Sequence, residues 1–214
     1  MLLVEAAALA LLLARRRKAV EQALKAGQWP ALGIFAALQH TIALTREAAR
    51  MLAFARLQLQ FPDLPLMRSP FGPGVDRIRA GQIARRQVAD LELRVARLEL
   101  AELSAERRWA IALAKTEGRV AATAATETFS AASAERTLVT RQLGGGYQLL
   151  KVWDAQLDAC PICFRMDGIT VPVSAHFPGG LEPAMVHPWC RCWCTIIRGF
   201  PRRRTFPLEP REAA

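Results

Sequence analysis

The sequence has few aromatic residues, few histidines and no cysteine before Cys160. Aromatic residues make up 7% of the chain and include a single Tyr, so a core built from this sequence is mostly aliphatic. Leu and Ala supply much of the apolar material, and both residue types favour helices. The composition therefore predicts a mainly α-helical fold.

The small number of histidines argues against several classes of enzyme that use histidine in catalysis or metal binding. His40, His176 and His187 are its only histidines, and the cysteine-rich segment contains no Asn. The chain therefore has few of the residues that a His-Asn-His nuclease needs. The sequence patterns of a His-Glu-x-x-His hydrolase and of a zinc deaminase are absent. We predict that the protein is not an enzyme, although Asp158, Asp167 and Glu182 are candidate general bases in a hydrolase or nuclease interpretation.

Long hydrophobic runs are also missing. A transmembrane helix needs about 20 apolar residues, and the apolar opening, residues 1–14, is shorter than that. Its charge order is the reverse of a secretory signal, because Glu5 lies inside the run and the basic residues follow it. We interpret this segment as an apolar first helix packed against protein, and we expect no membrane association.

Acidic residues are outnumbered by basic ones. The 29 Lys and Arg residues exceed the 19 Asp and Glu residues, which gives a net charge of +10. Such a surplus favours a polyanionic partner, with nucleic acid as the first candidate. Two basic runs are the candidate phosphate contacts, although a solvated surface explains them equally well. They are Arg15, Arg16, Arg17 and Lys18, and then Arg202, Arg203 and Arg204.

Residues 1–143 are predicted to form a helical docking region. Four stretches show the apolar spacing of helices, and a proline-rich loop at 61–74 separates the second from the third. The predicted helices cover residues 2–26, 31–60, 77 or 83 to 115, and 116–143.

The third predicted helix has two apolar stripes. Val88, Leu91, Val95 and Leu98 form one, which reaches the polar Glu102 after two heptads. Leu93, Leu100 and Leu103 form the second, which predicts contacts on two sides of the helix. This pattern favours a helical bundle or hairpin over a lone coiled coil.

A different organisation is predicted beyond the triple glycine at 144–146, which we interpret as a hinge because no Lys-Ser or Lys-Thr follows it to make a phosphate loop. Residues 147–153 and 169–173 have the composition of short strands. We therefore predict a small α+β module over residues 147–199, followed by a basic, proline-rich and flexible tail at 200–214.

All five cysteines lie in this module, in an arrangement that predicts a metal site. Cys160 and Cys163 have the two-residue spacing that aims both sulfurs at one ion. A second half-site with a His and further cysteines follows at a distance typical of structural zinc sites. The candidate ligands are Cys160, Cys163, His187, Cys190 and Cys192, with Cys194 at greater reach, and we favour the first three with either Cys190 or Cys192.

The predicted zinc is structural. A catalytic zinc keeps an open coordination position and a nearby base, and no known arrangement of that kind is present. The segment from Trp153 to Phe200 has little apolar material for a core of its own, so we expect the metal to stabilise it. Trp153, Trp189 and Trp193 are expected to pack around the site.

These residues resemble the Mu-type phage minor head protein family, also called phage head morphogenesis proteins. The resemblance covers residues 110–197, and its most specific element is His187-Pro188-x-Cys190-Arg191-Cys192. The other matching motifs are Lys115-Thr116-Glu117, Lys151-Val152-Trp153, Cys160-Pro161-Ile162-Cys163, Asp167-Gly168 and Phe177.

The resemblance implies a structural protein of the virion, made in the host cytoplasm and placed at the portal vertex or capsid interior. It implies a role in head assembly and in DNA packaging or ejection, with a few copies in each particle. The implied partners are the portal protein, the major capsid protein and double-stranded DNA bound without sequence specificity. The alternative is a cytoplasmic zinc-dependent nucleic-acid-binding protein, which would need a recognition helix.

Overall fold

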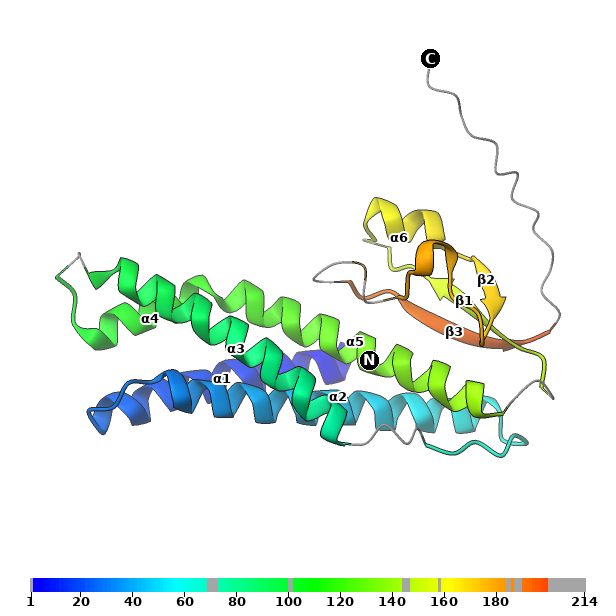
Figure 1. Ribbon diagram of the computed structural model, residues 1–214, viewed down its shortest axis with the longest axis horizontal. Coiled ribbons are helices and arrows are strands. Elements are labelled where there is room, and N and C mark those ends of the chain that lie inside the picture. The colour runs from blue at the N-terminus through cyan, green and yellow to red at the C-terminus, as the bar shows by residue number, and fades with distance from the viewer. Residues whose placement is uncertain are drawn as a thin grey trace, which may run out of the picture.

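The computed structural model describes residues 2–68, 73–99, 102–143, 147–157, 159–183, 186 and 190–199. A bundle of long helices forms one layer, and a small three-stranded sheet with a short helix lies on one end of it (Figure 1). The predicted mainly helical fold with a small C-terminal α+β region is confirmed. The predicted hinge at 144–146 and tail at 200–214 lie outside the described residues.

The first two helices form an antiparallel hairpin close to the predicted bounds. Helix α1 spans Leu2–Lys25 and α2 spans Ala31–Gln60. Gly27 ends α1 with a φ of +64°, the left-handed conformation that glycine adopts without a steric penalty. The amide of Gln28 then donates to the carbonyl of Ala23 at 2.8 Å, which turns the chain toward α2.

The third predicted helix is wrong in its extent. The chain forms α3 over Pro73–Arg97 and a separate α4 over Ala105–Lys115. Ser104 caps α4, because its side-chain oxygen accepts the amide of Arg107 at 3.3 Å. The break is therefore encoded by a capping residue that the apolar spacing concealed.

The second predicted apolar stripe is only partly buried, so it does not form the second contact surface that its spacing predicted. Val88, Leu91 and Val95 are buried as predicted, but Leu93 is 52% exposed and Leu103 is half-buried. Leu100 lies outside the described residues. Asp90 and Arg94, four residues apart on α3, form an ion pair with 3.0 Å between carboxylate and guanidinium.

Helix α5, Glu117–Gln142, completes the bundle and supplies two buried carboxylates. Arg46 and Arg50 of α2 lie between them and Asp76 of α3. Arg46 Nε is 2.7 Å from Asp76 Oδ1, and Arg50 Nη1 is 3.3 Å from a carboxylate oxygen of Glu135. The six members of this charge network are Arg46, Arg50, Asp76, Arg79, Glu127 and Glu135.

The sheet has the strand order β2-β1-β3 and is antiparallel throughout. Strands β1 (Leu149–Asp154) and β2 (Thr170–Pro172) match the two predicted strands. Helix α6 (Pro161–Met166) and strand β3 (Trp193–Arg198) were not predicted; α6 begins inside the first metal half-site, and β3 follows directly after the second. A 3-10 turn, η3, covers Pro178–Gly180.

The sheet shares its core with the bundle. Leu57 and Phe61 from the end of α2 and Val139 of α5 pack in one cluster with Trp153 and Ile196 of the sheet. In Figure 1, α2 and α5 extend beneath the sheet at this end of the molecule. Residues 147–199 and the helices therefore contribute to one shared apolar cluster.

We expect removal of one buried carboxylate from the charge network to lower the free energy of unfolding of the protein. Glu127→Gln leaves Arg46 and Arg79 without their shared counter-charge, and breaking a buried pair in this way costs about 3–5 kcal/mol. The free energy of unfolding from denaturant titration measures this loss. Glu47→Gln is the matched control: the exposed pair of Glu47 with Arg68 contributes at most about 1 kcal/mol. Equal losses in the two variants would contradict the importance of the network.

Candidate metal centre

Three cysteine sulfurs gather in a buried cluster between α6 and the segment that leads into β3. The sulfurs of Cys163, Cys190 and Cys192 all lie within 4.8 Å of one another, and this group can hold a metal ion. Cys163 Sγ and Cys190 Sγ are 3.7 Å apart. That separation is much longer than the disulfide bond of about 2.05 Å, and none of the described cysteines forms a disulfide.

Local structure explains how the first half-site is formed. Cys160 is the N-cap of α6, and its sulfur accepts the amide of Cys163 at 3.5 Å. Pro161 occupies the first turn of α6, where its missing N–H costs no hydrogen bond. The Cys-Pro-x-Cys sequence therefore builds a capped helical turn that directs Cys163 into the core.

The second half-site lies where the chain enters the sheet. Cys190 and Cys192 precede β3, whose pairing with β1 places Cys194 opposite Trp153. The antiparallel pairing of β3 with β1 thus brings Cys190 close to Cys163, although the two residues are 27 positions apart in the sequence. The cluster depends on strand pairing that the cysteine spacing alone does not specify.

The cluster is unfavourable for negative charge in the absence of a cation. Burial, together with the neighbouring Cys190 and Cys160 thiols, raises the pKa of Cys163 to about 12. A hydrogen bond with Cys190 and burial also raise the pKa of Cys192, against an opposing backbone hydrogen bond from Gln156. Three thiolates in this space require a positive ion between them.

The remaining candidate ligands have different positions. Cys160 is half-buried next to Cys163 and lies outside the group of three mutually close sulfurs. His187 is outside the described residues. Where the sequence left a choice between Cys190 and Cys192, the structure brings both of them to Cys163.

Cys194 faces away from the cluster and toward the bundle. Its sulfur lies 3.6 Å from Thr137 Oγ1 and 3.9 Å from the carbonyl oxygen of Ser133, both on α5. Burial raises the pKa of this thiol. Cys194 therefore belongs to the contact between β3 and α5.

The candidate bases form hydrogen bonds elsewhere in the module. Asp167 Oδ1 accepts the amide of Ala155 at 2.9 Å, and Asp158 lies outside the described residues. Glu182 accepts from the ammonium of Lys151 at 2.8 Å and lies 3.1 Å from Nδ1 of His176. Sequence reasoning missed Lys151, which is fully buried, although a Lys inside an apolar strand was a visible sign of a buried ion pair.

Of the tryptophans expected to pack around the site, Trp153 lies in the apolar cluster that contains the three cysteines, whereas Trp193 packs in a different cluster with α5. Trp153 is fully buried and meets Phe177 edge-on with ring centroids 5.1 Å apart. Trp193 lies beneath the guanidinium of Arg136, 4.4 Å from its ring centroid, and so contacts α5. Trp189 lies outside the described residues.

One of the predicted phosphate contacts is wrong. Arg16 is 2% exposed and donates to Thr116 Oγ1 at 2.6 Å, and burial lowers its pKa to about 10. Arg15 is half-buried and donates to Thr41, whereas Arg17 and Lys18 are exposed. Successive helical residues point about 100° apart, so this basic run is divided among several faces of α1. Arg202, Arg203 and Arg204 are outside the described residues.

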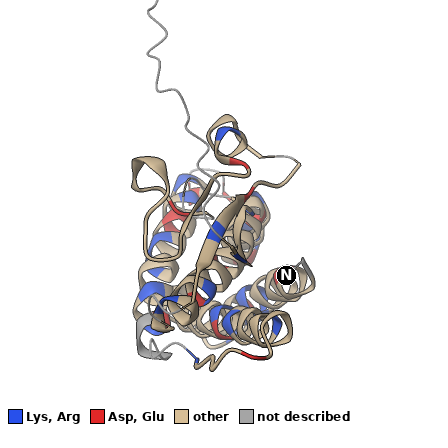
Figure 2. Ribbon diagram, turned by 90° about the vertical axis from the view of Figure 1, so that its right-hand side faces the viewer, with Lys and Arg blue, Asp and Glu red and all other residues tan. Residues whose placement is uncertain are grey.

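Basic residues are distributed over several elements of the described structure. Lys and Arg occur on the helices and on the sheet alike in Figure 2. None of the helices in the described part of the chain combines the length and apolar character needed to cross a bilayer.

A contact joins the cysteine segment to the first helix. Arg191 lies between Cys190 and Cys192, and its Nε is 3.4 Å from Oε1 of Glu5 on α1. The cysteine cluster is therefore held next to the bundle by an ion pair in addition to the shared apolar core.

Comparison with protein-family models, curated proteins and solved structures finds no match to this chain. Its chemistry is therefore argued from its own residues.

We expect Cys163→Ala to abolish metal binding and Cys194→Ala to preserve it. Cys163 belongs to the sulfur cluster, so its loss should abolish stoichiometric binding, whereas Cys194 contacts α5 and its loss should preserve binding. Thiolate-to-metal charge-transfer absorption during titration with Co²⁺ measures both outcomes. Retained Co²⁺ absorption in Cys163→Ala would contradict the assignment of the cluster.

Proposed function

We propose that this chain is a structural minor head protein of a tailed phage, in which zinc bound by the cysteine cluster holds the C-terminal module against a helical docking region. The observation that supports it best is the convergence of the two motifs behind the resemblance. Cys163 comes from the Cys-Pro-Ile-Cys motif, Cys190 and Cys192 come from the His-Pro-x-Cys-Arg-Cys motif, and their sulfurs meet in one buried cluster. In this proposal the metal has an architectural role.

The donor set favours zinc. Zinc–sulfur bonds of about 2.3 Å in a tetrahedron separate the sulfurs by about 3.8 Å, which agrees with the 3.7 Å between Cys163 and Cys190. Three soft thiolates in a buried site suit zinc better than calcium or magnesium, which prefer oxygen ligands. Cys160 and His187 are the candidates for the fourth position.

A structural role is supported by the surroundings of the cluster. Its three sulfurs are buried, and the candidate bases Asp167 and Glu182 are bound to a backbone amide and to Lys151. The ion compensates the buried thiolate charge and joins α6 to the segment before β3. A rigid module on a long bundle suits a protein that joins other proteins in a particle.

The proposed partners are the portal protein, the major capsid protein and packaged DNA. A net charge of +10 favours proximity to DNA, and binding through phosphates is independent of sequence and weakens steeply with salt. Arg17 and Lys18 are the exposed members of the first basic run. The alternative function is that of a cytoplasmic zinc-dependent nucleic-acid-binding protein. The density-gradient experiment described below distinguishes the two.

Zinc binding should release protons from the cluster. The raised pKa values of Cys163 and Cys192 keep both thiols protonated near neutral pH without metal, and zinc binds the thiolates. Affinity for zinc should therefore increase as the pH rises and fall as the pH decreases. Calorimetric titrations in two buffers with different ionisation enthalpies measure the protons released. Identical enthalpies in both buffers would show that the thiols do not bind the metal.

The phage-head proposal predicts that the chain travels with DNA-filled particles. We expect mass spectrometry of density-gradient fractions from the producing cells to find a few copies per nuclease-resistant particle. Cys163→Ala should reduce this incorporation, and Cys194→Ala should leave it nearly unchanged. Wild-type chain found only as free protein at the top of the gradient would reject the proposal and favour the cytoplasmic alternative.

A further inference from the structure

The outer face of the hairpin formed by α1 and α2 exposes apolar side chains where a solvated surface has charged ones. Leu3 is 87% exposed and Leu32 is 82% exposed, and Leu11, Leu44 and Met51 are also exposed. In the first 14 residues the only charged side chain is that of Glu5, which pairs with Arg191. Exposed apolar surfaces of this kind mark interaction sites.

Two hollows follow the crevice between these helices. One, of about 850 Å³, lies between the second half of α1 and the first half of α2. The other, of about 330 Å³, lies between the beginning of α1 and the middle of α2. Because α1 and α2 are antiparallel, the hollows lie end to end along one groove, which follows about 20 residues of α1 or roughly 30 Å.

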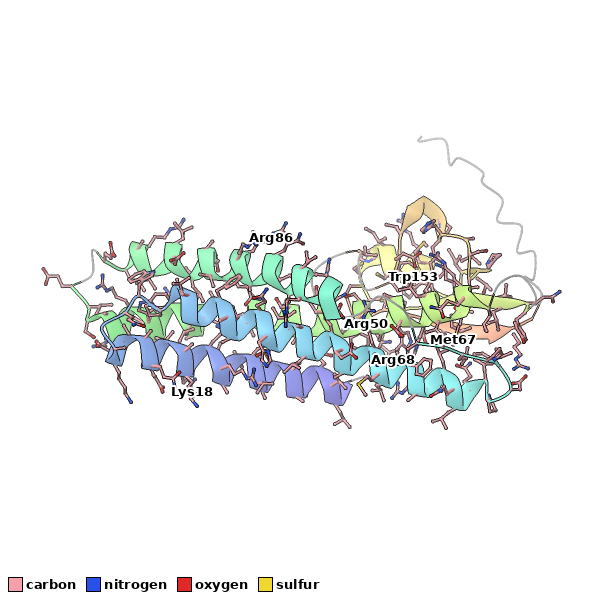
Figure 3. All side chains as sticks on the ribbon, turned by 60° about the horizontal axis from the view of Figure 1, so that its bottom comes forward. Lys18, Arg50, Met67, Arg68, Arg86 and Trp153 are labelled. Atoms are coloured by element: carbon pink, nitrogen blue, oxygen red, sulfur yellow. The ribbon has the colours of Figure 1, made fainter. Side chains whose placement is uncertain are left out.

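The groove has a small, apolar floor and positive walls. Ala19, Ala36 and Ala37 line the larger hollow, next to Arg15 and Lys18. Among the described residues that line the two hollows there is no Asp or Glu. Figure 3 shows Lys18 projecting from α1 on the side of the molecule opposite Arg86. A ligand that fits must therefore be apolar along its centre and negatively charged along its edge.

We infer that this groove binds an amphipathic α-helix of another protein, with an apolar stripe against the alanines and carboxylates facing Arg15 and Lys18. A helix lying in a groove is anchored by apolar residues spaced three and four apart, and the groove is long enough for about five turns. Small floor residues allow close approach of the helix backbone.

Charge distinguishes this occupant from two others. A second copy of the chain brings the same cations and no groove carboxylate, so its association leaves Arg15 and Lys18 uncompensated. Nucleic acid offers phosphates to the cations but has no counterpart for the exposed leucines of the same face. This inference rests on the groove alone and is independent of the phage-head proposal.

The test uses two synthetic helical peptides of about 20 residues, each with a Leu and Ala stripe. One peptide has Glu and the other Lys at the positions that flank the stripe. Fluorescence anisotropy with the full chain should show tighter binding of the Glu peptide. Lys18→Glu should weaken this binding about fivefold and strengthen binding of the Lys peptide, because an attraction is replaced by a repulsion.

Arg86→Glu is the matched control, since it makes the same change of charge at an exposed position of α3 away from the groove. It should leave the affinities for both peptides unchanged. Leu44→Asn, at an exposed position whose substitution preserves the fold, should weaken both peptides.

Three results would overturn the inference. The two peptides could bind wild-type chain equally, or Lys18→Glu and Arg86→Glu could have the same effect. Sedimentation could also show a dimer of the chain that Leu44→Asn dissociates, in which case a second copy covers the face.

Discussion

The placement of the cysteine cluster depends on the apolar core that α2 and α5 share with the sheet. Residues 147–199 supply most of the buried side chains of this core, and Leu57, Phe61 and Val139 from the helical part complete it. Strand β3 packs on α5 through Cys194, and its pairing with β1 leaves Cys190 and Cys192 facing Cys163. The geometry of the candidate metal centre thus depends on the packing of the sheet against α2 and α5 as well as on the cysteine spacing.

The bundle that supports this core is specified by charge as well as by apolar packing. Ala and Leu side chains pack adequately in many registers, because they are small or flexible and lack directional contacts. Two buried arginines, three buried carboxylates and the partly exposed Arg79 among α2, α3 and α5 allow far fewer arrangements, since any shift leaves a buried charge without its partner. The network therefore provides the specificity that an Ala-rich composition lacks.

The sulfur cluster and the groove are formed by different elements of the chain. The sheet end has the sulfur cluster and the Arg191–Glu5 pair, which tie the module to α1. The α1–α2 face has the positive groove and the exposed leucines. The cysteine cluster lies between α6 and the segment before β3, whereas the groove is lined by α1, α2 and the turn between them.

Local sequence patterns determined the helices at 2–26, 31–60 and 116–143, two of the strands, and the membership of Cys163, Cys190 and Cys192 in a candidate metal site. Those features depend on residue spacing and on short-range propensity, which a sequence displays directly. Tertiary structure alone decided that Cys194 contacts α5, that Arg16 is buried, and that Glu182 pairs with Lys151. Each of these outcomes depends on which residues distant in the chain become neighbours, because burial and charge pairing are set by packing between elements and not by order along the sequence.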